Sequence, residues 1–365
     1  MLGKTLTLYF LRHFAKLTIS VFLLVLVIIA LASYFELADR ALNNEAADWK
    51  TLALVALFRV PAVSEDTVSF TVLYGAIAAF IITNRRLEVV VARAAGVSAW
   101  QFLLPACAVG LLFGVFMTTV YNPFASSLFV MSQNLTSTAF GFNAKQLGQS
   151  DDSGPIWVRQ RSGAMESIIG SQSTFDGGLG LTNATAYVFD AEGRFLRRID
   201  APTAHFFPGA WRLDDAIETT VDQTPKYVPL YSLPTNLTTN EVKQTFLQLD
   251  SVSFWTLPGL IASARRAGVS ADRYVLQFNV LLARPILLMA LVLIAANVSL
   301  RFSRSRNIAG VIITGVAIGF MLYIVLKIVG DLGSGGIVPP LLAAWLPAVV
   351  ATLVGVTVLL HLEDG

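Results

Sequence analysis

Cysteine and histidine are scarce in this chain, and their scarcity excludes several kinds of site. The 365 residues include one cysteine, Cys107, and three histidines. A disulfide needs two cysteines, and most protein zinc sites draw on several cysteine or histidine ligands, so we expect neither a disulfide framework nor a cysteine-based metal site. The motif His-Glu-x-x-His is absent, which argues against a zinc protease.

Motifs for nucleotide binding and catalysis are also missing. No segment matches G-x-x-x-x-G-K-[ST], and the glycines Gly333, Gly335 and Gly336 are not followed by a lysine. Around His205 no serine, cysteine or carboxylate pair has a convincing catalytic spacing. We therefore expect no catalytic residue, no metal and no directly bound cofactor. If the protein uses ATP, another chain must hydrolyse it.

Charged residues are also scarce and make up only 14% of the chain, whereas hydrophobic residues make up 55%. The mean hydropathy is +0.65. Such a composition is typical of a polytopic membrane protein. Runs long enough to cross a bilayer lie near Leu17–Leu37, Thr67–Thr83, Ala99–Tyr121, Tyr274–Leu300, Ile308–Val329 and Ile337–Leu362.

Basic residues in the short loops orient these six runs. They precede the first run and follow the second and fourth runs: Lys4, Arg12, Lys16, Arg85, Arg86, Arg93, Arg301, Arg304 and Arg306. The positive-inside rule makes those ends cytoplasmic, and the even number of spans places both termini there. We therefore expect a multi-pass membrane protein, with the polar insert after the third run outside the inner face, in a periplasm or an equivalent space.

The polar insert reads as a β-domain. Short runs of β-branched and aromatic residues alternate with turn signals from Pro155 to Val228. The clearest turn is Glu192-Gly193, between Tyr187-Val188-Phe189 and Arg194-Phe195-Leu196, because Gly193 can adopt the positive φ of a tight reversal. Repeated short strands indicate a sandwich, a jelly roll or an open barrel.

The predicted fold is thus an α-helical membrane protein of six transmembrane helices with an inserted all-β periplasmic domain. We place three transmembrane helices and a cytoplasmic helix near 85–96 in residues 1–121. The β-domain takes residues 122–252, and a connecting helix with the last three spans takes residues 253–365.

Charged residues inside or at the ends of spans are candidates for function. Arg284 lies near the middle of the fourth span, where an unpaired charge costs several kcal/mol, so it must face protein or water. Two pairs of opposite charge, Glu36 with Arg40 and Lys327 with Asp331, have i,i+4 spacing at outer helix ends. Each pair is either an interfacial ion pair or part of a cavity for an amphiphile with an anionic headgroup. Whether Arg284 is structural or functional stays open.

Two glycine pairs suggest close contacts between helices, and the loop after the second span reads as a short helix. Gly110 and Gly114 in the third span, and Gly315 and Gly319 in the fifth, form small-xxx-small pairs that allow close helix approach. The fifth span could therefore hold a partner. The cytoplasmic stretch 85–98 reads as a short helix that Gly96 ends.

The order of these parts resembles the LptF/LptG family, the permease subunits of the lipopolysaccharide exporter of Gram-negative inner membranes. The resemblance covers essentially the whole chain and favours the LptG branch. Locally it is carried by the stretches 87–98, Gly209-Ala210-Trp211-Arg212-Leu213, Ala271-Asp272-Arg273-Tyr274, Gly335-Gly336-Ile337-Val338-Pro339-Pro340 and Trp345 to Pro347.

This resemblance implies a β-jellyroll and a set of partners. They are an LptF-like permease subunit in a heterodimer, an LptB-like ATPase dimer, an LptC-like periplasmic bridge protein and lipopolysaccharide. No nucleic acid is expected. The ATPase would sit under the cytoplasmic helix, with coupling contacts from Leu87, Glu88, Val91, Arg93 and Gly96.

The resemblance also implies a substrate cavity bounded by spans one and five, where Ser33, Glu36, Arg40, Lys327 and Asp331 lie. Members of the LptG branch often carry several lysines on the outer half of span one, whereas this chain has Ser33, Tyr34, Glu36 and Arg40. A substrate with fewer phosphates, or with acidic sugars in their place, would fit that loss of positive charge. Two other functions stay open from the sequence alone, a membrane scaffold and a lipid-modifying enzyme.

Overall fold

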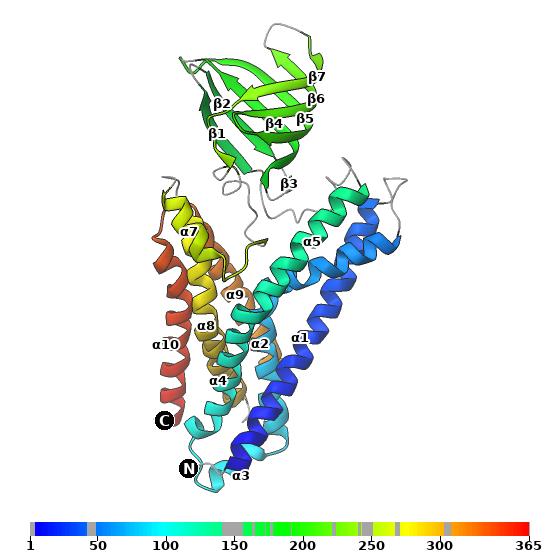
Figure 1. Ribbon diagram of the computed structural model, residues 1–365. Helices are drawn as coiled ribbons and strands as arrows, with labels where there is room; N and C mark the ends of the chain where they lie inside the picture. The colour runs from blue at the N-terminus through cyan, green and yellow to red at the C-terminus, as the bar shows by residue number, and fades with distance from the viewer. Residues whose placement is uncertain are drawn as a thin grey trace.

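The structure, a computed structural model, describes residues 4–41, 49–140, 156–162, 165–171, 173–175, 178–190, 192–220, 224–239, 242, 251–266, 271–302 and 308–364. Long helices form one part of the molecule, and a β-sheet lies beyond one end of them (Figure 1). Six helices in the described residues are long and apolar enough to span a membrane, which confirms the predicted α-helical membrane protein.

The six long helices are α1 (Lys4–Ala41), α2 (Trp49–Arg85), the α4 to α5 segment, α8 (Asp272–Phe302), α9 (Ile308–Ser334) and α10 (Pro340–Asp364). The described residues also include the short helices α3 (Glu88–Ala94), between α2 and α4, and α7 (Leu257–Arg266), between the sheet and α8. The start of α1, the end of α10 and α3 all lie at the end of the bundle away from the sheet (Figure 1).

The third helix extends beyond the end that hydropathy predicts at Tyr121. Helix α4 (Ala99–Phe116) passes through a π-helical turn (Met117–Tyr121) into α5 (Asn122–Phe140). Although α5 is rich in polar residues, its Leu135 packs beside a buried cluster that α1 and α2 provide, and Ser132 Oγ donates to the Val55 carbonyl at 3.2 Å. Tertiary packing of one apolar side therefore keeps this polar segment helical.

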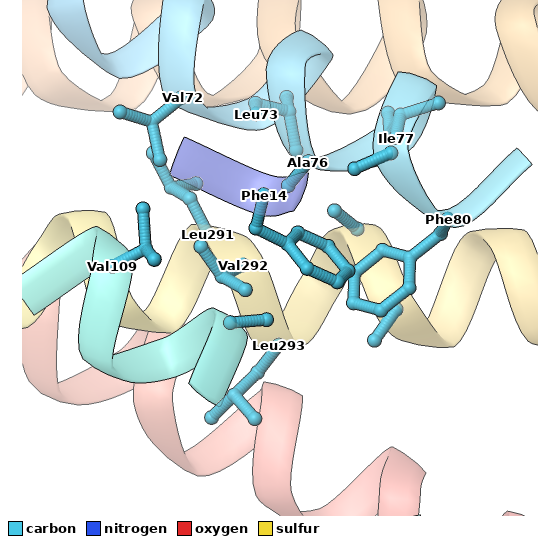
Figure 2. Packing of buried hydrophobic residues seen from close by; sticks show 14 of the residues in the cluster. Phe14, Val72, Leu73, Ala76, Ile77, Phe80, Val109, Leu291, Val292 and Leu293 are labelled. Atoms are coloured by element: carbon cyan, nitrogen blue, oxygen red, sulfur yellow. The ribbon is translucent and has the colours of Figure 1, made fainter. Parts of the chain in front are cut away.

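Helix α8 lies at the centre of the bundle, where α2, α4 and α10 pack against it. Figure 2 shows part of the resulting core, in which the rings of Phe14 and Phe80 meet edge to face with centroids 4.7 Å apart. A Cβ on Gly114 would come within 2.5 Å of Pro285 Cα, so this position requires glycine for the α4–α8 contact.

The glycine pair of the fifth span also meets a helix of the same chain. A Cβ on Gly315 would lie 2.7 Å from Ile77 Cδ1, and one on Gly319 would lie 2.7 Å from the hydroxyl of Tyr74. Both neighbours belong to α2. Gly315 and Gly319 thus lie against side chains of α2 in the same chain, and a partner interface through the fifth span stays a prediction.

The β-domain is one antiparallel sheet, which confirms the all-β prediction. Its strands are β1 (Ile156–Ser162), β2 (Met165–Ser171), β3 (Ser173–Phe175), β4 (Gly180–Phe189), β5 (Phe195–Phe207), β6 (Ala210–Thr220) and β7 (Lys226–Pro234). The order is β1-β2-β4-β5-β6-β7, with β3 paired to β4. One face covers a core around the fully buried Trp211. That the domain is a jellyroll stays a prediction.

The predicted hairpin is present between β4 and β5. Gly193 has φ +80°, as the tight reversal requires. Asp190 stabilises the turn because its Oδ1 accepts the backbone N–H groups of Glu192 at 3.0 Å and Arg194 at 2.8 Å.

Candidate functional site

Helix α3 fixes Glu88 against the first membrane helix. Tyr9 Oη donates a hydrogen bond of 2.9 Å to Glu88 Oε1, and the guanidinium of Arg86 lies 3.9 Å from the same oxygen. Leu87 precedes the helix with φ +59°, and Gly96 follows it with φ +83°. The predicted cytoplasmic helix therefore exists as a short helix between two backbone reversals, and Glu88 orients it on α1.

The outer side of α3 is apolar. Val89 is buried in the helical core, whereas Leu87, Val90 and Val91 expose 60%, 55% and 66% of their surface. Three neighbouring exposed aliphatic side chains on a loop outside the spans are typical of a protein contact. The side chain of Arg93 lies outside the described residues.

The predicted cavity residues on α1 occupy different environments. Ser33 is buried, and Glu36 is partly exposed. The carboxylate of Glu36 lies 3.9 Å from Nη1 of Arg59, a buried residue of α2, so an ion pair joins the two helices. The side chain of Arg40 lies outside the described residues.

The predicted residues on α9, Lys327 and Asp331, are both exposed near the sheet end of the helix. Helix α9 packs on α8, α10 and α2, while α1 packs mainly on α2 and α4. The two predicted groups therefore lie on two different helices that both pack on α2. That they form one substrate cavity stays a prediction.

Helices α1 and α9 nevertheless share one property. Only 17% of the most apolar window of each is buried, compared with 56% for α2 and 50% for α8. Their exposed faces carry large apolar side chains, among them Phe35 on α1 and Phe320 on α9. Among the spans in the described residues, these two have the least buried apolar windows.

Arg284 has a partner that the sequence analysis did not identify. Its Nη1 donates to Glu65 Oε2 at 2.9 Å, and the two side chains expose only 13% and 11% of their surface. Asn122 Nδ2 donates to both oxygens of Glu65, at 3.0 and 3.2 Å. The charge of Arg284 is thus neutralised inside the chain, between α2, α5 and α8.

The same polar cluster holds the segment through which the chain returns from the β-domain. Asn122 Oδ1 accepts the backbone N–H of Phe254 at 2.7 Å. At the π-helical turn, the carbonyl of Thr119 accepts a hydrogen bond of 3.0 Å from the indole Nε1–H of Trp255. Thr118 Oγ1 in the same turn donates to the Leu281 carbonyl of α8 at 2.9 Å. A π-turn changes the helical pairing to i→i+5 and is often found at functional positions. Here it connects the third helix to the return segment.

Comparison with known proteins identifies a family. The family model described as "Lipopolysaccharide export system permease LptF/LptG" matches residues 8–361. The protein named "Lipopolysaccharide export system permease protein LptG" from Escherichia coli K12 is 25% identical over 187 residues, which are 50% of this chain and 52% of that protein. The protein of the same name from Escherichia coli O6:H1 gives the same values. The chain thus spans about half the length of these relatives.

Proposed function

The chain belongs to the LptF/LptG family of lipopolysaccharide export system permeases, and from that membership we propose that it is one membrane subunit of an ATP-driven lipopolysaccharide exporter. It would extract the lipid from the outer leaflet of a bacterial inner membrane and pass it to a periplasmic bridge. Both termini would be cytoplasmic and the β-domain periplasmic.

The observation that carries this proposal is the exposure of α1 and α9. Each buries only 17% of its most apolar window, although four other spans of the chain bury 33% to 56%. A single permease chain that shares a cavity with a second chain must leave some helices unpacked. The two least buried helices also carry the charged residues Glu36, Lys327 and Asp331. An LptF-like second subunit facing α1 and α9 would close a cavity that has apolar walls and charged residues at its outer end.

Helix α3 is the proposed contact for the ATPase. It lies at the opposite end of the bundle from the sheet (Figure 1), and it exposes Leu87, Val90 and Val91. An LptB-like ATPase dimer seated there would push on α3. Because Glu88 accepts a hydrogen bond from Tyr9 of α1, a displacement of α3 would also displace α1, a proposed wall of the cavity.

The first experiment tests the assembly. The chain is tagged at its C-terminus, extracted gently from its native membrane, and analysed by mass spectrometry for proteins and lipids. We expect an ATPase, a second six-span chain, an LptC-like protein and lipopolysaccharide. Reproducible recovery of the chain alone, without lipid, would overturn the proposal.

A single substitution tests the role of α3. Val91→Glu places a charge in the exposed apolar surface, and we expect the ATPase to be lost from the purified complex while the second permease subunit remains. Leu230→Glu on β7 is the matched control, because Leu230 is also exposed and apolar but lies in the sheet. Equal recovery of the ATPase with both variants would contradict the contact at α3.

A further inference from the structure

A proline in the middle of the sheet creates a pocket. Pro202 lies within β5, which is paired on both sides, and it has no N–H to donate to either neighbour. The pairing is interrupted at that level on both sides. Between β4 and β5 the register skips Asn183 and Pro202. Between β5 and β6 it skips Ala201 and Pro202 on one strand and Asp215 and Ala216 on the other.

The two residues opposite this interruption adopt a strained backbone. Asn183 of β4 has φ +49°, and Asp215 of β6 has φ +53°. These are the left-handed values that non-glycine residues avoid and that asparagine and aspartate tolerate best. Both residues line a cavity of about 480 Å³ together with Pro202. Such strain is retained in functional sites more often than elsewhere.

A row of side chains across five strands forms the base of this pocket. The register aligns Trp157, Gly170, Thr185, Asp200 and Ile217, and all five line the cavity. A Cβ on Gly170 would overlap the indole of Trp157, so this glycine allows the ring to lie flat on the sheet. Trp157 is 46% exposed, which leaves part of the ring available to a ligand.

The polar groups of the pocket are fixed in advance. Asp200 Oδ1 accepts hydrogen bonds from Thr185 Oγ1 at 2.8 Å and from Nη2 and Nε of Arg198 at 2.8 and 3.0 Å. These bonds fix the carboxylate, and its Oδ2 accepts no hydrogen bond from the described residues. Asn183 Nδ2 is buried and has no hydrogen-bond partner in the described part of the chain. The pocket thus offers one oriented acceptor beside an aromatic ring, next to a buried amide donor.

The chemistry of the lining selects the ligand class. The lining contains one cation, Arg198, and two carboxylates, Asp200 and Asp215, so the pocket has no excess positive charge to hold a phosphate or another anion. The pocket lies on the face of the sheet, where a peptide cannot add as a further strand. A neutral sugar has hydroxyl groups that both donate and accept, and a face of C–H groups that packs on an aromatic ring.

We propose that this pocket binds a neutral sugar residue of a glycan, with the sugar ring on Trp157 and a hydroxyl group donating to Asp200. The glycan would be either the saccharide part of the exported lipid or a free periplasmic oligosaccharide. That the glycan belongs to the exported lipid rests on the proposed function. That the pocket binds a sugar does not depend on that function.

Binding to the purified full-length chain, with the partners it retains, tests this assignment. Saturation-transfer NMR and calorimetry are run with two probes, the oligosaccharide released from lipopolysaccharide by mild acid and the neutral oligomer maltotriose. We expect at least one probe to bind. Trp157→Ala should weaken binding about tenfold, which is the loss of one good aromatic contact.

Asp200→Asn and Phe207→Ala complete the test. The first is isosteric and should weaken binding without unfolding the domain, while Phe207 is an exposed aromatic residue at the far end of β5 and serves as the control. Preference for the first probe identifies the lipid saccharide, and preference for maltotriose identifies a free glycan. Failure of both probes to bind, or binding that Trp157→Ala leaves unchanged, would overturn the sugar site. If lipopolysaccharide still co-purifies with the chain in that case, the proposed function stands.

Discussion

The helical part and the β-domain use charged residues in opposite ways. In the helices, Arg284 and Glu65 are 219 residues apart in the chain, and both side chains are nearly buried. In the sheet, ion pairs join residues close in sequence or on adjacent strands, as in Arg194 with Asp190 and Arg197 with Glu218. The arginine of the first of these pairs is 75% exposed.

This difference follows from the surroundings. Within a bundle that spans a membrane, a charge has no water to solvate it and must find a partner on another helix. One buried pair can therefore fix the relative positions of several helices. In the sheet, water already solvates the charges, so each exposed pair adds little to stability. The β-domain also has its own buried apolar cluster around Trp211.

The largest effect is expected when the buried pair is broken. Arg284→Leu leaves the carboxylate of Glu65 buried without its cation, which we expect to destabilise the protein by about 3–5 kcal/mol. The return segment at Phe254 would loosen too, because Asn122 links it to Glu65. The amount of monodisperse protein that survives heating in detergent measures the loss.

The double variant separates charge from packing. With both Glu65→Leu and Arg284→Leu no unpaired charge remains, and we expect part of the stability of the wild-type protein to return. If Arg284→Leu alone is as stable as the wild type, the pair does not hold the helices together.

An intermediate effect is expected for the pair that is only half buried. The carboxylate of Glu36 is 38% exposed and lies 3.9 Å from Arg59, whose side chain is only 6% exposed. Glu36→Gln removes the negative charge beside this buried cation and should cost about 1–2 kcal/mol, less than Arg284→Leu. The same heating measurement checks this value. Because Glu36 also lies in the proposed cavity, lipopolysaccharide recovered with the variant is measured in parallel.

The two measurements on Glu36→Gln distinguish its roles. Unchanged stability with reduced lipid would support the cavity role, and reduced stability with unchanged lipid would show that the carboxylate serves only to join α1 to α2. Arg59 is the poorer choice for this test, because it is buried and its loss would disturb packing.

Local features of this fold could be predicted from the sequence, and distant pairings could not. The turn at Gly193 was predictable because all the residues that determine it lie within ten positions. Composition alone indicates six spans. The membership of Asn122–Phe140 in a helix was not predictable, because its polar composition resembles a loop and the packing against α2 that stabilises it comes from a distant segment.

For the sites too, single residues could be predicted from the sequence, but their distant partners could not. Arg284 could be singled out as a charge inside a span, but its partner Glu65 depends on how α2 and α8 pack. Pro202 could have signalled a strand interruption, since proline is excluded from paired strand interiors. Only the sheet register shows that Asn183 and Asp215 lie on either side of that interruption and line the same pocket.

The smallest effect is expected at the exposed hairpin of the β-domain. Asp190 accepts the backbone N–H of Arg194, and this hydrogen bond together with the Arg194 guanidinium holds the pKa of the Asp190 carboxyl below its ordinary value. A lowered pKa in the folded state means that the charged form stabilises the turn. That contribution is fully present above the ordinary aspartate pKa of about 3.9 and is lost as the pH falls through the lower, folded value.

Asp190→Asn tests this pH dependence because asparagine keeps an oxygen for the two backbone N–H groups but removes the charge. At neutral pH we expect slightly faster amide exchange at Glu192 and Arg194 in the variant than in the wild type. Below the folded pKa of Asp190 the two proteins should exchange alike, since the wild-type carboxyl is then neutral as well. The rest of the sheet is the internal reference. A difference between the two proteins that persists at low pH would mean that the shape of the side chain, and not its charge, stabilises the turn. The turn could then not be compared with the buried pair of Arg284 and Glu65 as a second case of stabilisation by charge.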